Sequence, residues 1–357
     1  MRSGERPTRI EGLDALRGLA VALVLVRHSW PEFAGTAGVV GVVVFFTLSG
    51  YLITGLLVRD LEHYGHVRYG RFYRNRAFRL IPALLFLLTA IAVITLSLDP
   101  LDDRSGLTRA ILVGLTYTAN IPFAHGSATV EHLWTLATEE QFYVVWPVIL
   151  ALGVRFRRSR LALAVSAGIV SAALITTIAL TYPGVAGIYP LPTSWCLAMV
   201  AGAAAHFERD RITRWLPLNS RRTAIASLLA LVTLLVIALM PENKGSPLLY
   251  LVIGPLIAVA SIVLIMQVSA WTRLPRRELR PLLWLGTISY AVYLWNWPIV
   301  VWLGPQPLDA PLAWLAIPLT IGAASASWWL VEAPAAKLKR RLERTRPSDG
   351  ARATILK

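Results

Sequence analysis

Long apolar segments recur along the whole chain and constrain its fold more than any other feature. Eleven of them are long enough to matter, allowing for short or tilted membrane spans. They lie at 13–31, 38–58, 79–98, 107–121, 136–154, 160–181, 193–207, 222–240, 248–268, 284–304 and 312–331. Inside a bilayer the backbone must satisfy its own hydrogen bonds, and segments of this length do so as helices. The sequence therefore predicts an all-α, polytopic integral membrane bundle.

Composition supports this fold class and narrows the possible partners. Hydrophobic residues make up 56% of the chain and charged residues only 15%, far from the usage of soluble domains. The formal net charge is +15, but the arginines cluster in connectors between apolar segments, so we interpret the charge as membrane topology and expect no nucleic-acid partner. The single cysteine, Cys196, excludes an intrachain disulfide. His63 and His66 lack a third ligand nearby, so no metal site is predicted.

The basic connectors predict which side of the membrane each loop faces. Those expected to be cytoplasmic are the N-terminus, 59–79, 155–160, 209–222, 273–280 and the tail from Lys337. The alternation fails only between Asp103 and Arg155, where two apolar segments must together make one crossing. We therefore predict that the shorter one, 107–121, is a re-entrant or half helix, which leaves about ten transmembrane helices with both termini cytoplasmic. The predicted units are a transmembrane domain at 9–334 and a basic cytoplasmic tail at 335–357.

Two ionisable residues, Arg17 and His28, lie eleven positions apart inside the first apolar segment. On a helix, eleven steps return to within roughly 20° of the starting direction and rise about 16 Å, so both side chains share one face at two depths. Ionisable residues inside a membrane are costly and usually line a bundle interior or a wet cavity, which favours a functional site. The alternative is that Arg17 reaches back to the headgroups while His28 lies at the opposite interface.

Glu139 and Glu140 lie near the start of a segment, HLWTLATEEQFYVVWP, that is predicted to enter from the outer side. The helical rise places them roughly 9 to 10 Å below its outer end, and His28 about 5 Å below the outer end of the first helix. We expect the glutamates and the histidine to meet, because a carboxylate can orient an imidazole that removes a proton from a hydroxyl. An internal ion pair between two helices is the alternative. His132 is a candidate supporting residue near the outer face.

Arginines cluster at the predicted cytoplasmic end of the third apolar segment. The stretch RFYRNRAFRLIP contains Arg71, Arg74, Arg76 and Arg79. Arg76 and Arg79 are three positions apart and therefore share a helix face. Together with Arg17 they are predicted to bind a polyphosphate, because each guanidinium can hold phosphate oxygens through two parallel hydrogen bonds. An ordinary basic cytoplasmic loop is the alternative.

Two further stretches contain polar or small residues within apolar sequence. Gly41 and Gly50 in GVVVFFTLSGYLIT permit helices to approach closely, and we interpret Ser49 beside them as architecture rather than as a nucleophile. Asn296 in SYAVYLWNWP must find a hydrogen-bond partner, because a polar group left unpaired in such surroundings is costly.

Five motifs occur in order along the chain: LDALRGLAVALVLVRH, FFTLSGYLIT, RFYRNRAFRLIPAL, HLWTLATEEQFYVVWP, and SYAVYLWNWP followed by LVEAP at Glu332. In this order they closely resemble the membrane acyltransferase 3 family, over about 9–334. Members of this family move an acyl group, commonly acetyl, from cytoplasmic acyl-CoA to a hydroxyl of a glycan or other acceptor. The residues that match the family's functional positions are His28, Arg17, Arg76, Arg79 and Glu139.

The chain departs from that family pattern at three places. An acidic residue often precedes the paired phenylalanines, where this chain has Val43 and Val44, so any role for that carboxylate is absent. Histidine often stands within the YLWxWP stretch, where this chain has Asn296. Some relatives carry an appended extracytoplasmic hydrolase-like domain, which we do not expect here, so the acceptor would be handled by the membrane unit or by a partner.

The resemblance implies a membrane-bound O-acyltransferase of the cell (plasma) membrane. It would move an acyl group, expected to be acetyl, from cytoplasmic acyl-CoA to a hydroxyl of a cell-envelope glycan. The expected catalytic residues are His28, Glu139 and Glu140, and the expected ligands of the acyl-CoA phosphates are Arg17, Arg76 and Arg79. Two alternatives stay open: the same chemistry on a small secondary metabolite such as a macrolide sugar, and a transporter or flippase in which the buried charges relay protons. The oligomeric state also stays open.

Overall fold

The computed structural model describes residues 9–121, 126–218, 220–304 and 314–344, and every regular element in these ranges is helical. The α-helices are α1 (Glu11–Ser29), α2 (Ala37–Tyr64), α3 (Tyr69–Ser97), α4 (Leu107–Thr116), α5 (Trp134–Arg155), α6 (Ser159–Thr181), α7 (Pro192–Phe207), α8 (Arg209–Trp215), α9 (Arg221–Leu239), α10 (Gly254–Val268), α11 (Arg280–Thr287), α12 (Ser289–Leu303), α13 (Ala316–Ser327) and α14 (Ala333–Arg344). A 3₁₀ turn at Ala128–Leu133 precedes α5, and π-helical turns lie at Leu249–Ile253 and Trp328–Glu332. The predicted all-α class is confirmed.

Five stretches of the described chain are both long and apolar enough to cross a membrane. They are α2, α3, α6, α9 and the run Leu249–Val268. A hydrocarbon core about 30 Å thick takes about 20 helical residues. α7 and α12 have only 16 and 15 residues and fall short of that length. The total of about ten spans and the cytoplasmic placement of both termini stay predictions.

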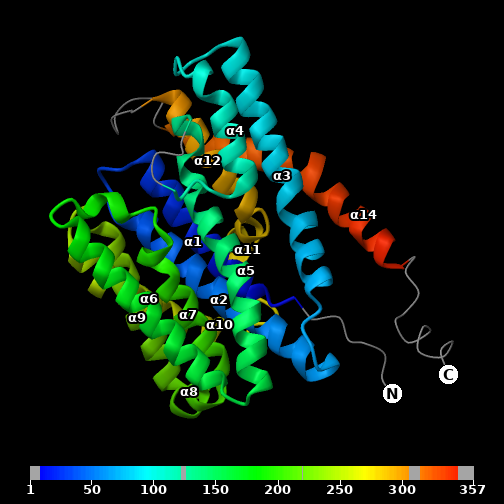
Figure 1. The fold of residues 1–357 in the computed structure, drawn as a ribbon, viewed down its shortest axis with the longest axis vertical. Coiled ribbons are helices and arrows are strands. Elements are labelled where there is room, and N and C mark those ends of the chain that lie inside the picture. Colours follow the sequence, from blue (N-terminus) through cyan, green and yellow to red (C-terminus); the bar gives the residue numbers. More distant parts are fainter. Residues whose placement is uncertain (1–8, 122–125, 219, 305–313, 345–357) are drawn as a thin grey trace.

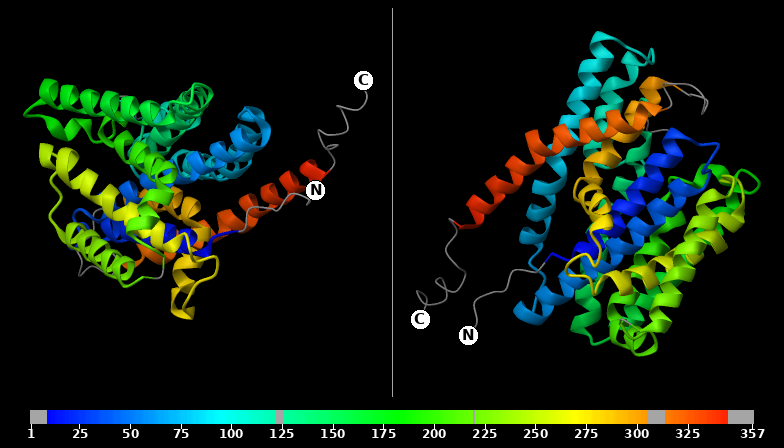
Figure 2. Two further views of the ribbon diagram at one scale, coloured as in Figure 1. Left: turned by 90° about the horizontal axis from the view of Figure 1, so that it is seen from below. Right: turned by 180° about the vertical axis from the view of Figure 1, so that it is seen from behind.

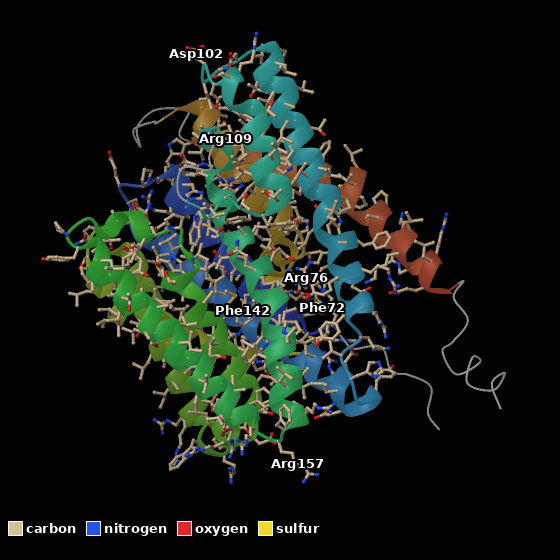
Figure 3. All side chains as sticks on the ribbon, in the orientation of Figure 1. Phe72, Arg76, Asp102, Arg109, Phe142 and Arg157 are labelled. Carbon is tan, nitrogen blue, oxygen red and sulfur yellow. The ribbon has the colours of Figure 1, made fainter. Side chains whose placement is uncertain are left out.

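The segment 107–121 contains a helix of half the usual span length, in agreement with the predicted half helix. α4 has ten residues, which rise about 15 Å, half the thickness of the hydrocarbon core. It ends at Tyr117, whose φ of 53° is left-handed and stops the helix. Figure 3 shows Asp102 and Arg157 at opposite ends of the bundle, so the chain between them passes from one end to the other. A short α4 followed by the 22 residues of α5 accounts for that single passage.

Two predicted spans are not single straight α-helices. The segment 284–304 is divided into α11 and α12 at Ile288, whose ψ of 10° interrupts the helix. The last span continues through its π-helical turn directly into α14, so the predicted domain boundary after residue 334 lies inside a helix. Residues 345–357 of the predicted tail lie outside the described chain. In Figure 1, α14 runs obliquely beside α3, with which it is in contact.

Three hydrophobic cores, one large and two smaller, make up the interior of the described bundle, and α1 and α5 each contribute to two of them. The larger core joins residues of α1, α2, α5, α6, α7, α9 and α10. The second joins α3, α4 and α12 with the start of α5. The third joins α1 with α12 and α13. Figures 1 and 2 show this division, with α6, α7 and α9 on one side of the central α1 and α2, and α3 and α14 on the other. Polar residues at the boundary are therefore flanked by packed helices on both sides.

Glycines allow close backbone contact between the central helices. A Cβ added at Gly50 of α2 would lie 1.9 Å from the carbonyl oxygen of Met199 in α7, and a Cβ at Gly202 would lie 1.9 Å from that of Thr47. A Cβ added at Gly41 would lie 2.4 Å from a backbone oxygen of α1. Helices approach this closely only where a residue has no side chain. The expected role of Gly41 and Gly50 in close helix approach is therefore confirmed.

Replacing Gly50 with alanine should force α2 and α7 apart and lower the free energy of unfolding by about 1–3 kcal/mol, the usual cost of overpacking. Unfolding of the purified protein in mixed micelles of increasing SDS content, followed by tryptophan fluorescence, measures this change. Gly168 in α6 is the matched control, because a Cβ there meets nothing within 4 Å. Gly168→Ala should be neutral or stabilising by up to about 1 kcal/mol. Equal destabilisation by the two substitutions would contradict the packing argument.

Candidate active site

Arg76 of α3 is held in place by two groups of α5. Its guanidinium forms an ion pair with the Glu140 carboxylate, and its Nε also donates to Glu140 Oε1 at 3.2 Å. The guanidinium carbon lies 3.7 Å from the centre of the Tyr143 ring, a cation–π contact. The Arg76 and Glu140 side chains are 16% and 18% exposed, so this pair is largely removed from solvent. Figure 3 shows Arg76 between the two ends of the bundle marked by Asp102 and Arg157.

Arg79 lies one turn after Arg76 and differs from it in having no bonded partner. It makes no hydrogen bond or ion pair with any residue that the structure describes, and its side chain is exposed. Arg17, Arg76 and Glu139 nevertheless act on it electrostatically, so all three lie nearby. The three predicted phosphate ligands are thus brought together, and Arg79 is the one whose hydrogen-bond donors are free to bind an anion.

Arg17 of α1 is paired within its own helix. Its Nη1 donates to Asp14 Oδ1 at 2.9 Å, and the other Asp14 oxygen accepts from Arg9 at 2.5 Å. Asp14 is buried, and the opposite charge of Arg17 offsets the cost of that burial. Asp14 is not among the predicted site residues, although its position three residues before Arg17, on the same helix face, indicates such a pair.

The glutamates lie with the arginines and not with the histidine. Ser49 Oγ of α2 donates to Glu139 Oε1 at 2.7 Å, and Glu140 pairs with Arg76. The expected contact of Glu139 and Glu140 with His28 is therefore wrong. The physical reason is the length of α3, which begins at Tyr69, ten residues before the predicted span. Arg76 consequently lies about 10 Å inside its helix from one end, at the level that Glu140 reaches from the other end.

His28, near the end of α1, contacts α12 instead. Its Nδ1 lies 2.7 Å from Oδ1 of Asn296, and its ring centre lies 4.8 Å from that of Trp297, with the planes at 64°. Asn296 is buried, and its Nδ2 donates to Thr320 Oγ1 of α13 at 3.3 Å. Asn296 thus has the hydrogen-bond partners that its position inside an apolar helix requires. A single helix, α1, carries Arg17 near the arginine cluster and His28 near α12 and α13.

His132 belongs to a buried network beside the His28 site. Its Nε2 bonds the carbonyl oxygen of Leu294 at 3.1 Å, while its Nδ1 has no partner within the described chain. The Tyr293 hydroxyl donates to the backbone oxygen of His132 at 2.7 Å and accepts from Thr135 at 2.5 Å. Tyr293 interacts electrostatically with Glu139, and His132 with His28, so this network is near both the arginine cluster and His28.

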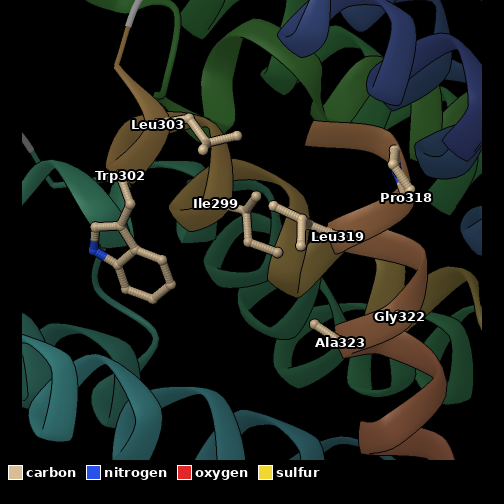
Figure 4. A pocket seen from close by; sticks show the side chains of 7 residues that line it. All are labelled: Ile299, Trp302, Leu303, Pro318, Leu319, Gly322 and Ala323. Carbon is tan, nitrogen blue, oxygen red and sulfur yellow. The ribbon is translucent and has the colours of Figure 1, made fainter. Parts of the chain in front are cut away.

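An apolar groove of about 480 Å³ runs between α12 and α13 (Figure 4). Its lining residues are Ile299, Trp302, Leu303, Pro318, Leu319, Gly322 and Ala323. None of them is ionisable, so the groove offers no acid–base chemistry, and it includes none of the predicted site residues. Within the described ranges, no group of three or more His, Cys, Asp or Glu side chains is placed to hold a metal ion.

The chain is similar to known proteins over nearly its whole length. A family model described as "Acyltransferase domain" matches residues 10–332. The protein named "Peptidoglycan O-acetyltransferase OatA", from Listeria monocytogenes, is 26% identical over 331 residues, which cover 86% of this chain and 52% of that protein. The protein named "Putative peptidoglycan O-acetyltransferase YrhL", from Bacillus subtilis, is 30% identical over 350 residues, covering 91% of this chain and 54% of that protein. The chain thus spans about half the length of these two relatives. No solved structure matches it.

Replacing Glu140 with glutamine should leave the Arg76 charge enclosed without a counter-charge. We expect the free energy of unfolding to fall by about 3 kcal/mol, as when one partner of a buried ion pair is removed. The matched control is Glu208→Gln in the pair between Glu208 and Arg160, whose Arg160 side chain is 81% exposed. That substitution should change the free energy by less than about 1 kcal/mol. A similar loss in both variants, measured by unfolding in SDS, would argue against an enclosed pair.

Proposed function

This chain belongs to the Acyltransferase domain family, and we propose that it is a membrane-bound O-acyltransferase that moves an acetyl group onto a hydroxyl of a cell-envelope glycan. Both relatives described above are named as peptidoglycan O-acetyltransferases, which supports an acceptor of this class. The several helices that are long and apolar enough to cross a bilayer support a multi-pass location, which we propose is the plasma membrane.

The observation that carries this proposal is the unpaired guanidinium of Arg79. Arg17 and Arg76 each have a carboxylate partner, so part of their hydrogen-bonding capacity is already used within the chain. Arg79 is exposed and has no bonded partner in the described chain, so its donors are available to a ligand. A guanidinium fits a phosphate through two parallel hydrogen bonds. This fit supports acyl-CoA as the donor, with its phosphates on Arg79 and its neighbours.

The proposed transfer uses His28 as the general base. Acyl-CoA enters from the side of the arginine cluster, and its thioester extends along α1 toward His28, about 16 Å away by helical rise. The imidazole takes the proton of the acceptor hydroxyl while the hydroxyl oxygen attacks the thioester carbon. The carbon–sulfur bond breaks, and the CoA thiolate receives the proton from the imidazole. Glu139 accepts a hydrogen bond from Ser49 and lies close to Arg76 and Arg79, so its proposed role is electrostatic, at the end of the path where the donor binds.

Replacing Arg79 with glutamine should raise the dissociation constant of CoA by about 10- to 100-fold, because one charge-assisted pair of hydrogen bonds is lost. Isothermal titration of the purified protein in lipid nanodiscs with CoA measures this constant. Arg160→Gln is the control, because Arg160 is highly exposed and already bound to Glu208. It should leave the affinity unchanged. Unchanged affinity in Arg79→Gln as well would remove Arg79 from the donor site.

Replacing His28 with alanine should lower kcat about 100- to 10,000-fold, the usual contribution of a general base, and leave CoA binding intact. The assay follows thiol released from acetyl-CoA by the purified protein in the presence of peptidoglycan fragments. His63→Ala is the control, because His63 is exposed and bonds only the backbone of its own helix. A normal rate in His28→Ala protein that binds CoA would show that the base is another group. Wild-type protein that consumes no acetyl-CoA would favour a carrier over an enzyme.

A further inference from the structure

A chain of side-chain hydrogen bonds connects α13, α12 and α1. Thr320 Oγ1 donates to the carbonyl oxygen of Ala316 at 2.6 Å. Asn296 Nδ2 lies 3.3 Å from Thr320 Oγ1, and Asn296 Oδ1 lies 2.7 Å from His28 Nδ1. Thr320 and Asn296 are 0% and 1% exposed, so these groups must satisfy one another because solvent does not reach them.

The direction of each hydrogen bond follows from the first one. A threonine hydroxyl has a single proton, and Thr320 uses it on the carbonyl four residues before it in the helix. Toward Asn296, the Thr320 oxygen can only accept, so the amide nitrogen must face it. The amide oxygen then faces His28 and can only accept. His28 Nδ1 must therefore carry a proton to complete the chain.

We infer that Asn296 and Thr320 are positioning residues that hold neutral His28 with its proton on Nδ1 and a free lone pair on Nε2. The bond made by one ring nitrogen decides which tautomer a histidine adopts. A general base needs a lone pair on the nitrogen that faces its substrate, and Nε2 is the nitrogen left without a partner in the described chain. The tautomer follows from geometry alone, whereas its catalytic use rests on the proposed function.

This arrangement differs from the prediction that the Glu139 carboxylate supports His28. A neutral amide fixes the ring orientation without adding a negative charge beside it, and a charge there would have to be enclosed within the bundle. During transfer, Nε2 takes the hydroxyl proton of the acceptor as the new carbon–oxygen bond forms. It then returns that proton to the CoA thiolate as the carbon–sulfur bond breaks. The other ring proton stays on Nδ1 throughout, donated to Asn296 Oδ1 in a hydrogen bond, so the ring keeps its orientation in both halves of the step.

Nitrogen-15 NMR of histidine-labelled protein in nanodiscs tests the tautomer directly, with the His28 signals identified by their loss in His28→Ala. Wild type should show a protonated Nδ1 and an unprotonated Nε2. Thr320→Val has the same shape but lacks the acceptor for the amide nitrogen, so the amide can turn and both tautomers should appear. Thr320→Ser keeps the hydroxyl and should keep the wild-type spectrum. A proton on Nε2 in wild type, or an unchanged spectrum in Thr320→Val, would overturn the inference.

Steady-state kinetics give a second test, because a merely structural role would not lower kcat selectively at an unchanged KM. Thr320→Val should lower kcat about 5- to 10-fold with the KM for acetyl-CoA unchanged, because loss of one hydrogen bond releases the ring. Asn296→Leu should lower kcat by about 100-fold, and Asn296→Asp, which retains an oxygen toward His28, should lower it less. Equal loss in the leucine and aspartate variants would contradict the positioning role.

The two arms also separate this inference from the proposed function. If wild-type protein has the expected tautomer but turns over no acetyl-CoA, the proposed function fails and the assignment of the His28 proton stands. If wild type is active and its tautomer does not respond to Thr320→Val, the inference fails and the proposed function stands.

Discussion

The need to pair charge inside a closely packed helical bundle determines how the central helices are arranged. Arg76 can be enclosed between α3 and α5 only because Glu140 offsets its charge, and Arg17 is accommodated beside Asp14 for the same reason. These pairs fix α3 against α5 and set the direction of Arg17 on α1. Ser49 then connects α2 to the same cluster through Glu139. Among Arg17, Arg76 and Arg79, only Arg79 has no carboxylate partner in the described chain, and it differs from its neighbours for that reason.

This arrangement separates rigid parts of the site from the part available to a ligand. α5 contributes to the first and second hydrophobic cores and α1 to the first and third, and the charged residues of the site lie on these two helices and on α3. Glycine contacts bring the backbones of α2 and α7 together, so the larger core provides a stiff support on one side. α1 passes from the cluster to the contact between His28 and Asn296. The same helix therefore carries both Arg17 at the donor end and His28 at the acceptor end of the proposed reaction. The distance between these two residues cannot change unless α1 is interrupted.

The fold class, the half-length α4 and the close approach at Gly50 could be predicted from the sequence, because each depends on local composition or on the lack of a side chain. The pairing of Arg76 and Arg79 on one face could also be predicted, because the two residues are three positions apart on α3. The partners of Glu140 and His28 could not. Glu140 and Arg76 approach from opposite ends of two helices, and an error of ten residues in the start of α3 placed them at different levels. Asn296 is 268 positions from His28, and no local pattern indicates which buried polar groups will meet.

The shortness of α12 bears on how far the acyl group would travel in the proposed reaction. Fifteen residues rise about 22 Å, less than the roughly 30 Å of a typical hydrocarbon core, and α4 covers about half of that core. Lipids beside such helices adapt by local thinning of the bilayer, at a cost of fractions of a kcal/mol per Å of mismatch. The two aqueous surfaces of the membrane would then lie closer together at this protein than elsewhere. With the bilayer locally thinner, a soluble donor on one side would present its acyl group to an acceptor on the other side without crossing the membrane itself.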